Sequence, residues 1–157
     1  MNDTIERSQV HATFVIERTY PAPVAAVWHA LSDNDARDQW FSTETTFDAR
    51  EKSHEFRVGG HGTEEGQWHN GPQSRYLSTY TDIVDQQRIV FTYDMWVDGQ
   101  HMSTSLTTIA LEPAGGQTRL TYTEQGVHFD GLDSAEGREQ GCQGLLDQLG
   151  AYLAAGH

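Results

Sequence analysis

The stretch DSAEGREQGCQGLLDQLGAYLA, residues 133–154, decides the fold because it predicts one long amphipathic helix. On a helical wheel of about 100° per residue, its apolar side chains share one continuous arc. These side chains are Cys142, Leu145, Leu146, Leu149, Tyr152 and Leu153. Asp133 and Glu136 have the spacing of a capping box, which places Asp133 at the N-cap. A helix with one apolar face needs a second element to cover that face.

Three glycines, Gly137, Gly141 and Gly144, lie in a line along the edge of this arc. Each glycine costs about 1 kcal/mol of helix stability relative to alanine. The line therefore indicates that something approaches the helix backbone closely. The concave side of a sheet or a second chain is the favoured explanation, because glycines inside helices commonly have a packing reason. A ligand is the alternative.

The chain begins with a predicted strand and two short helices. Residues 13–20 are rich in β-branched and aromatic side chains, which predicts a strand. Apolar residues at positions i, i+3, i+4 and i+7 from Val24 predict the first helix. A polar break at 32–35 precedes a second, shorter helix, which ends near Trp40 and Phe41.

Strand patterns joined by turns fill most of the chain between these short helices and the last one. We predict strands at 45–49, 54–58, 76–84, 88–97, 101–111 and 118–127. Residues 61–74, which are rich in Gly, His and Glu, are predicted as a loop. Short connections such as the Asp98-Gly99 turn favour antiparallel pairing.

This order of elements predicts an α+β helix-grip fold. A curved antiparallel sheet would wrap around the long C-terminal helix, with two short helices after the first strand. Such an arrangement leaves a cavity between sheet and helix, and a cavity points to a small-molecule ligand. A length of 157 residues favours one domain. We therefore expect a flexible tail over 1–12 and a single domain over 13–157.

The composition excludes several classes of partner. Ten Lys and Arg against 23 Asp and Glu give a formal net charge of −13, which repels nucleic acid and anionic lipid. No apolar run is long enough to cross a membrane, and the polar N-terminus does not have the pattern of a signal peptide. Cys142 is the single cysteine, which rules out an internal disulfide and fits a reducing compartment. We expect a cytoplasmic protein.

A metal site and a cofactor are not expected. His54, His61 and His69 lie near Glu64 and Glu65, but on a predicted loop and without the spacing of paired ligands on a helix. The sequence also has no nucleophile elbow and no phosphate-binding glycine loop.

Acid–base chemistry remains a candidate on the last predicted strand. Leu120, Tyr122 and Glu124 share one face by the period of two. If Leu120 points inward, Tyr122 and Glu124 line the cavity, and Glu124 could act as a general base. His101, at a hairpin end, is a second candidate for acid–base chemistry. The favoured alternative is that Glu124 is simply solvated near the strand end.

Aromatic side chains spread over most predicted elements give a stronger indication of a pocket. Rings with polar tips suit a mostly apolar cavity with few hydrogen bonds. The predicted ligand-binding residues are Trp40, Phe41, Trp68, Tyr80, Tyr93, Trp96 and Tyr122. For any one of these residues, ordinary core packing is the alternative.

Short motifs over residues 13–154 carry a family resemblance. They are Arg18-Thr19-Tyr20-Pro21-Ala22-Pro23, Val27-Trp28, Leu31-Ser32-Asp33, Trp40, Phe56-Arg57-Val58-Gly59-Gly60, Arg88-Ile89-Val90-Phe91-Thr92-Tyr93, Leu111-Glu112-Pro113, Gly116-Gln117-Thr118-Arg119-Leu120, and Leu145, Leu149 and Leu153. With these the chain resembles the START-like (polyketide cyclase/lipid-transfer) superfamily. Within it, the chain is similar to the bacterial branch named after the C-terminal domain of the activator of heat-shock protein 90 ATPase. Cys142 departs from the pattern, because many relatives carry Trp there, and a smaller side chain reshapes the space beside the helix.

The predicted architecture and the aromatic content indicate reversible binding of a small hydrophobic or aromatic molecule, lipid-like or polyketide-like. A second hypothesis is an enzyme of the cyclase or aromatase kind, in which Glu124, Tyr122 or His101 moves protons. A third is a chaperone-linked or dimeric protein-interaction module, so the protein is expected as a monomer or a homodimer. The separate N-terminal domain of the eukaryotic co-chaperone is absent from this sequence, so ATPase activation is not expected.

Overall fold

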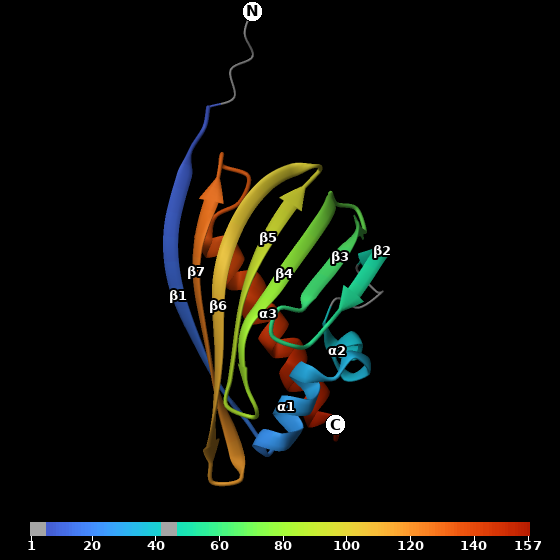
Figure 1. Ribbon diagram of the computed structural model, residues 1–157, viewed down its shortest axis with the longest axis vertical. Coiled ribbons are helices and arrows are strands. Elements are labelled where there is room, and N and C mark those ends of the chain that lie inside the picture. Colours follow the sequence, from blue (N-terminus) through green and yellow to red (C-terminus); the bar gives the residue numbers. More distant parts are fainter. Residues whose placement is uncertain (1–5, 42–46) are drawn as a thin grey trace, which may run out of the picture.

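The computed structural model describes residues 6–41 and 47–157. In this part of the chain, one strand and two short helices precede a run of strands and a long helix (Figure 1). The elements are β1 (Gln9–Tyr20), α1 (Val24–Ser32), α2 (Asn34–Trp40), β2 (Phe47–His54), β3 (His61–Trp68), β4 (Gln73–Val84), β5 (Arg88–Val97), β6 (Gln100–Ala114), β7 (Gln117–Phe129) and α3 (Ala135–Ala154).

All described strands belong to one antiparallel sheet of seven strands, in the order β1-β7-β6-β5-β4-β3-β2. The sheet is curved, and α3 lies across one of its faces with α1 and α2 near the C-terminal end of α3 (Figure 1). This arrangement confirms the predicted α+β helix-grip fold. The other face of the sheet carries no helix in the described residues.

Alternation along β7 directs one set of side chains toward α3. Leu120, Tyr122 and Glu124 are buried, whereas the flanking Arg119 and Gln125 are exposed and the two threonines between the buried residues are partly exposed. The predicted inward face of this strand is therefore confirmed, because side chains in a strand alternate with a period of two.

The core between sheet and helices is closed by hydrogen bonds that join distant elements. The Tyr20 hydroxyl donates to the Leu146 carbonyl at 2.8 Å, which ties the end of β1 to α3. The Trp40 indole donates to the Ala30 carbonyl at 2.8 Å and ties α2 to α1. Leu120 and Leu149 are fully buried between these contacts. The buried hydroxyl of Tyr20 and the buried indole N–H of Trp40 are therefore both paired with an acceptor.

The long helix starts one residue later than the capping box predicted. Ser134 is the N-cap, and its side chain accepts a hydrogen bond from the Gly137 amide at 3.0 Å. The predicted cap, Asp133, is wrong because its carboxylate accepts instead from Arg138 at 2.8 Å. Serine and aspartate are both good caps, so the tertiary partner of Asp133 decided between them.

Two segments differ from the sequence prediction in the middle of the chain. Residues 61–68 form β3 and not a loop, and 55–58 lie outside a strand. The glycines that indicated a loop are needed for close packing, since a Cβ on Gly66 would lie 2.2 Å from the Asp48 carbonyl oxygen. Part of the predicted strand 45–49 lies outside the described residues.

The first strand is longer than predicted. It begins at Gln9, because residues 9–12 pair with 126–129 of β7. The polar composition of this segment had suggested a tail, but as an edge strand it leaves many of its side chains in solvent. None of the described helices is long and apolar enough to cross a membrane.

Candidate functional site

A cavity of about 320 Å³ lies between the concave face of the sheet, α2 and α3. Six of the predicted ligand-binding residues line it, namely Trp40, Phe41, Trp68, Tyr80, Tyr93 and Tyr122. The residues that the prediction did not include are Leu31, Arg37, Phe47, Glu64, Ser74, Tyr76, Ile89, Phe91, Met95, Ile109, Arg138, Gly141, Cys142, Leu145 and Leu146. Predominantly apolar and aromatic walls with few polar groups are typical of small-molecule sites.

Four aromatic rings form a continuous row along one wall. The ring centroids of Phe41 and Tyr76 are 6.1 Å apart, those of Tyr76 and Tyr93 are 5.2 Å apart, and those of Phe91 and Tyr93 are 6.0 Å apart. These spacings lie within the range in which aromatic pairs attract one another. The row presents ring surface that a flat apolar molecule can contact.

Trp96 is the predicted ligand-binding residue that the structure places elsewhere. Its ring stacks on His101 at 5.0 Å, and the Arg75 guanidinium lies 4.7 Å from its centroid. Phe91, Tyr93 and Met95 line the cavity, so alternation with a period of two places Trp96 on the opposite face of β5. The spacing of three residues between Tyr93 and Trp96 therefore already separates the two rings.

A buried polar cluster closes the cavity where β5, β6 and β7 face the first turns of α3. Its centre is Arg138, whose side chain is 8% exposed. Its Nη1 lies 3.6 Å from the Glu124 carboxylate, and its Nη2 donates to Asp133 at 2.8 Å and to Ser103 at 2.7 Å. A buried cation is stable only when it is paired and hydrogen-bonded, and these three acceptors meet that need.

Glu124 lies behind the cavity wall with its side chain 1% exposed. Its Oε1 accepts hydrogen bonds from the Tyr93 hydroxyl at 2.8 Å and the Tyr122 hydroxyl at 2.9 Å. The favoured expectation of a solvated Glu124 is therefore wrong, because two phenols and one guanidinium replace water. Burial raises the pKa of both phenols well above the ordinary value, so they stay protonated as donors.

Arg138 is the main polar residue that the sequence analysis missed. Burial by itself lowers its pKa, but the contacts with Tyr93, Asp133 and Glu124 outweigh burial and raise it. The helical wheel held a signal, since Arg138 precedes Cys142 by four residues and so lies on the same face. Charged residues are almost never fully buried unless paired, and the partners here come from distant strands.

Cys142 and the line of glycines shape the α3 side of the cavity. Burial first, and the nearby Glu124 second, raise the pKa of the Cys142 thiol to about 12, so the thiol remains protonated at neutral pH. A Cβ on Gly141 or Gly144 would meet no atom within 4 Å. The sheet therefore does not press against this stretch of backbone, and Gly141 lines the cavity instead.

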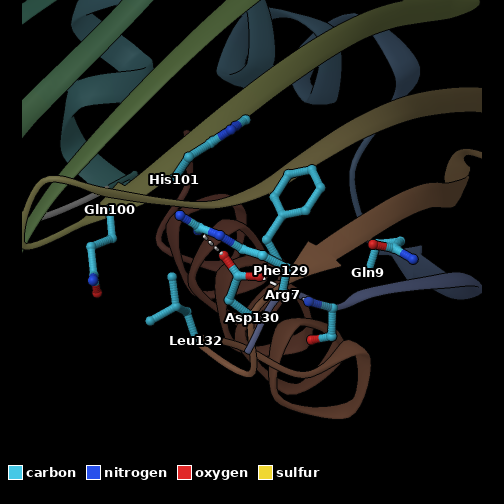
Figure 2. Close-up of a pocket in the computed structure, with 8 residues that line it drawn as sticks. Arg7, Gln9, Gln100, His101, Phe129, Asp130 and Leu132 are labelled. Carbon is cyan, nitrogen blue, oxygen red and sulfur yellow. Dashed lines mark hydrogen bonds and ion pairs between the residues drawn. The ribbon is translucent and has the colours of Figure 1, made fainter. Parts of the chain in front are cut away.

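His101 lies in a different place from Glu124. It lines a surface pocket of about 470 Å³ together with Arg7, Phe129 and Asp130 (Figure 2). Its Nε2 lies 3.0 Å from the Asp94 carboxylate, and its ring centroid lies 5.0 Å from that of Phe129. The structure thus does not bring the two predicted catalytic residues together.

His54 and His61 lie at one end of the β2–β3 hairpin, whereas His69 follows Trp68 at the other end. Among the described residues, no group of three or more His, Cys, Asp or Glu side chains is arranged to hold a metal ion. His54 instead contacts the Tyr80 hydroxyl through Nε2 and the Asn34 amide oxygen through Nδ1 at 2.6 Å. Burial, together with the positive charge of Arg37, lowers the pKa of His54 to about 4, so its ring is neutral at pH 7.

A curved sheet that grips a C-terminal helix over an aromatic cavity defines a START-like helix-grip domain. The family model described as Activator of Hsp90 ATPase homolog 1-like protein matches residues 21–154, so the chain belongs to this family. No functionally curated protein matches the chain in sequence.

Solved structures of bacterial proteins share the fold over nearly the whole chain. A protein from Rhizobium loti has 48% sequence identity and a TM-score of 0.85, with 92% of this chain and 99% of that chain covered. A protein from Rhizobium leguminosarum has 37% identity and a TM-score of 0.90, with 96% and 99% covered. An activator-like protein of the same family from Aeromonas hydrophila has 20% identity and a TM-score of 0.68, with 92% and 93% covered, and shows the fold alone.

Proposed function

We propose that this protein reversibly binds a small, predominantly apolar molecule with aromatic character in the cavity between the sheet and α3. The single observation that carries the proposal is the 320 Å³ cavity lined by aromatic rings. Burial of apolar ligand surface would supply about 25 cal/mol per Å², and the ring row would add stacking contacts. We expect this binding in the cytoplasm.

The polar groups of the cavity support binding over covalent chemistry at Cys142. A thiol with a pKa of about 12 is a poor nucleophile at neutral pH. The Tyr93 and Tyr122 hydroxyls already donate to Glu124, so these groups are arranged as a fixed wall.

Native mass spectrometry of freshly purified protein tests the proposal. A co-purified small molecule that is lost on denaturation is the expected result, and the same spectrum distinguishes monomer from homodimer. As a direct probe, naphthalene is titrated into the wild type by calorimetry. If naphthalene does not bind at its solubility limit and no molecule co-purifies, the proposal fails.

Two matched variants of α3 locate the site. Gly141→Leu places a side chain at the cavity, and we expect it to weaken naphthalene binding by about ten-fold or more. Gly144→Leu makes the same change on the same helix, also in open space, but Gly144 does not line the cavity. It should leave binding unchanged. Equal loss in both variants would place the binding site elsewhere.

A cyclase or aromatase activity is a second candidate because Glu124 is buried beside the cavity. The proton-moving role would belong to Glu124 with Tyr93 and Tyr122, since His101 lies in the surface pocket. The test is incubation of any co-purified molecule with the protein, followed by mass analysis. Conversion by the wild type and not by Glu124→Gln supports the enzyme, and an unchanged molecule supports binding alone.

A further inference from the structure

We propose that the cavity selects flat aromatic molecules carrying an uncharged hydrogen-bond-accepting oxygen, such as a ketone, over the same molecules carrying a carboxylate. Arg138 would donate to that oxygen. The inference rests on the proposed function and specifies the ligand class of the same site.

Arg138 keeps one donor for a ligand. Its Nη1 donates to the Tyr93 hydroxyl at 2.9 Å and to Ser105 at 3.5 Å, and its Nη2 donates to Ser103 and Asp133. These contacts occupy the donors of the two terminal nitrogens. Among the described residues none accepts from Nε, although Arg138 lines the cavity. An oxygen that reaches this N–H gains a hydrogen bond from a charged donor, which is stronger than a neutral one.

The phenols beside Arg138 are already used as donors. Tyr93 and Tyr122 both donate to the same oxygen of Glu124, and the Cys142 thiol is directed at the Tyr122 hydroxyl at 3.5 Å. At this end of the cavity, a ligand oxygen therefore has Arg138 as its available donor.

The charge around Arg138 disfavours an anionic ligand. Arg138 lies 3.6 Å from Glu124 and 2.8 Å from Asp133, so the three groups together carry one net negative charge. His128 also approaches Asp133, at 3.3 Å, from another element. A carboxylate bound here would bring a second uncompensated negative charge into a buried place, which costs far more than burial of a neutral oxygen.

The walls and volume indicate the size and shape of the ligand. The aromatic row from Phe41 to Tyr93 offers flat contact surface. A cavity of about 320 Å³ lies at the small end of the range for ligand pockets. A molecule of two fused rings with one small substituent is therefore a suitable probe.

Three probes with the same ring system separate the effect of the hydrogen-bonding oxygen from the effect of the negative charge. They are naphthalene, 2-acetylnaphthalene and 2-naphthoate, and the last two have nearly the same shape but differ in charge. We expect calorimetric titration of the wild type at pH 8 to show 2-acetylnaphthalene binding about ten-fold tighter than naphthalene, from one charge-assisted hydrogen bond. The 2-naphthoate anion should bind more weakly than 2-acetylnaphthalene by about ten-fold or more.

The outcomes distinguish this inference from the proposed function. If none of the three probes binds, both fail. If naphthalene binds but the ketone binds no tighter, or if 2-naphthoate binds as tightly as the ketone, the ligand class is overturned and the binding function stands.

Two arginine variants assign the preference to one side chain. Arg138→Met should remove the advantage of the ketone over naphthalene, provided that circular dichroism shows a folded protein. Arg37 also lines the cavity, and its guanidinium lies 3.7 Å from the Phe41 ring centroid. Arg37→Met should leave the tighter binding of the ketone over naphthalene unchanged. Loss of the ketone advantage in Arg37→Met but not in Arg138→Met overturns the assignment. If Arg138→Met does not fold, the three probes on the wild type still decide.

Discussion

Two regions of this protein contain an arginine paired with a carboxylate at almost the same distance. Inside the fold, Arg138 and Asp133 are 2.8 Å apart, and on the surface, Arg7 and Asp130 are 2.9 Å apart (Figure 2). The Arg138 side chain is 8% exposed and the Arg7 side chain is 74% exposed. The two ion pairs have similar distances but should contribute differently to stability. Water screens the charges of Arg7 and Asp130, whereas protein replaces most of the water around Arg138 and Asp133.

The largest expected effect is the loss of the inner arginine. Arg138→Met leaves the buried Glu124 and the partly buried Asp133 without their cation, and should lower the free energy of unfolding by about 3–5 kcal/mol. Arg7→Met on the surface should change it by about 0–1 kcal/mol. Urea unfolding followed by circular dichroism measures both. Similar losses in the two variants would contradict the distinction between the regions.

A smaller effect is expected from one hydroxyl in each region. Tyr93→Phe removes a donor to Glu124 and an acceptor from Arg138, and should cost about 1–3 kcal/mol. Thr104→Val removes a hydroxyl that donates to Asp94 on the partly solvated side, and should cost less than about 1 kcal/mol, because water can satisfy Asp94. Thermal unfolding at fixed pH compares them. A larger loss of stability for Thr104→Val would show that the contact between Thr104 and Asp94 stabilises the protein more than the buried contacts of Tyr93 do.

His54 is half-buried, and so lies between the buried Arg138 and the exposed Arg7 in its access to water. This position predicts that the stability of the protein depends on pH. The pKa of His54 is lowered to about 4 in the folded protein, against about 6.5 when unfolded. The unfolded chain therefore binds more protons between these values, and stability is fully present above pH 6.5 and falls as pH drops toward 4. We expect a loss of the order of 1 kcal/mol from pH 7 to pH 5, after allowance for solvent screening of the ring.

The variant His54→Phe isolates this contribution. Urea unfolding of wild type and variant at pH 7 and pH 5 should show a smaller pH-dependent loss in the variant, because Phe does not titrate. An identical loss in both proteins would assign the acid sensitivity to other groups.

The smallest expected effect compares two glycines of α3. Gly144→Ala should stabilise the protein by about 0.5–1 kcal/mol, because its Cβ enters open space and alanine favours the helix. Gly150→Ala should gain less or lose stability, because its Cβ would lie 3.2 Å from the Tyr20 ring. Chemical unfolding resolves the sign. An equal gain for both would mean that Tyr20 moves aside freely.

The sequence predicted the fold well where local patterns were sufficient. The strand at 88–97 was predicted with its observed bounds, and α3 with its apolar arc was predicted to within two residues. Strand β3 was missed because a local pattern rich in glycine is typical of a loop. Only the packing of β2 against β3 shows why glycine is needed there. Six of the seven predicted aromatic residues line the cavity, and the seventh, Trp96, lies on the opposite face of β5 because it is three residues from Tyr93.

By itself the sequence determined the succession of a strand, two short helices, a run of strands and a long helix, together with the apolar face of α3. Both follow from periods of two and about 3.6 residues along the chain. Only the tertiary structure decided which polar groups are buried. Glu124 and Arg138 lie on different elements, and each compensates the charge of the other in the interior. Tyr93 donates a further hydrogen bond to Glu124, and Asp133 accepts one from Arg138. Burial of a charge depends on partners from distant parts of the chain, and no local pattern contains that information.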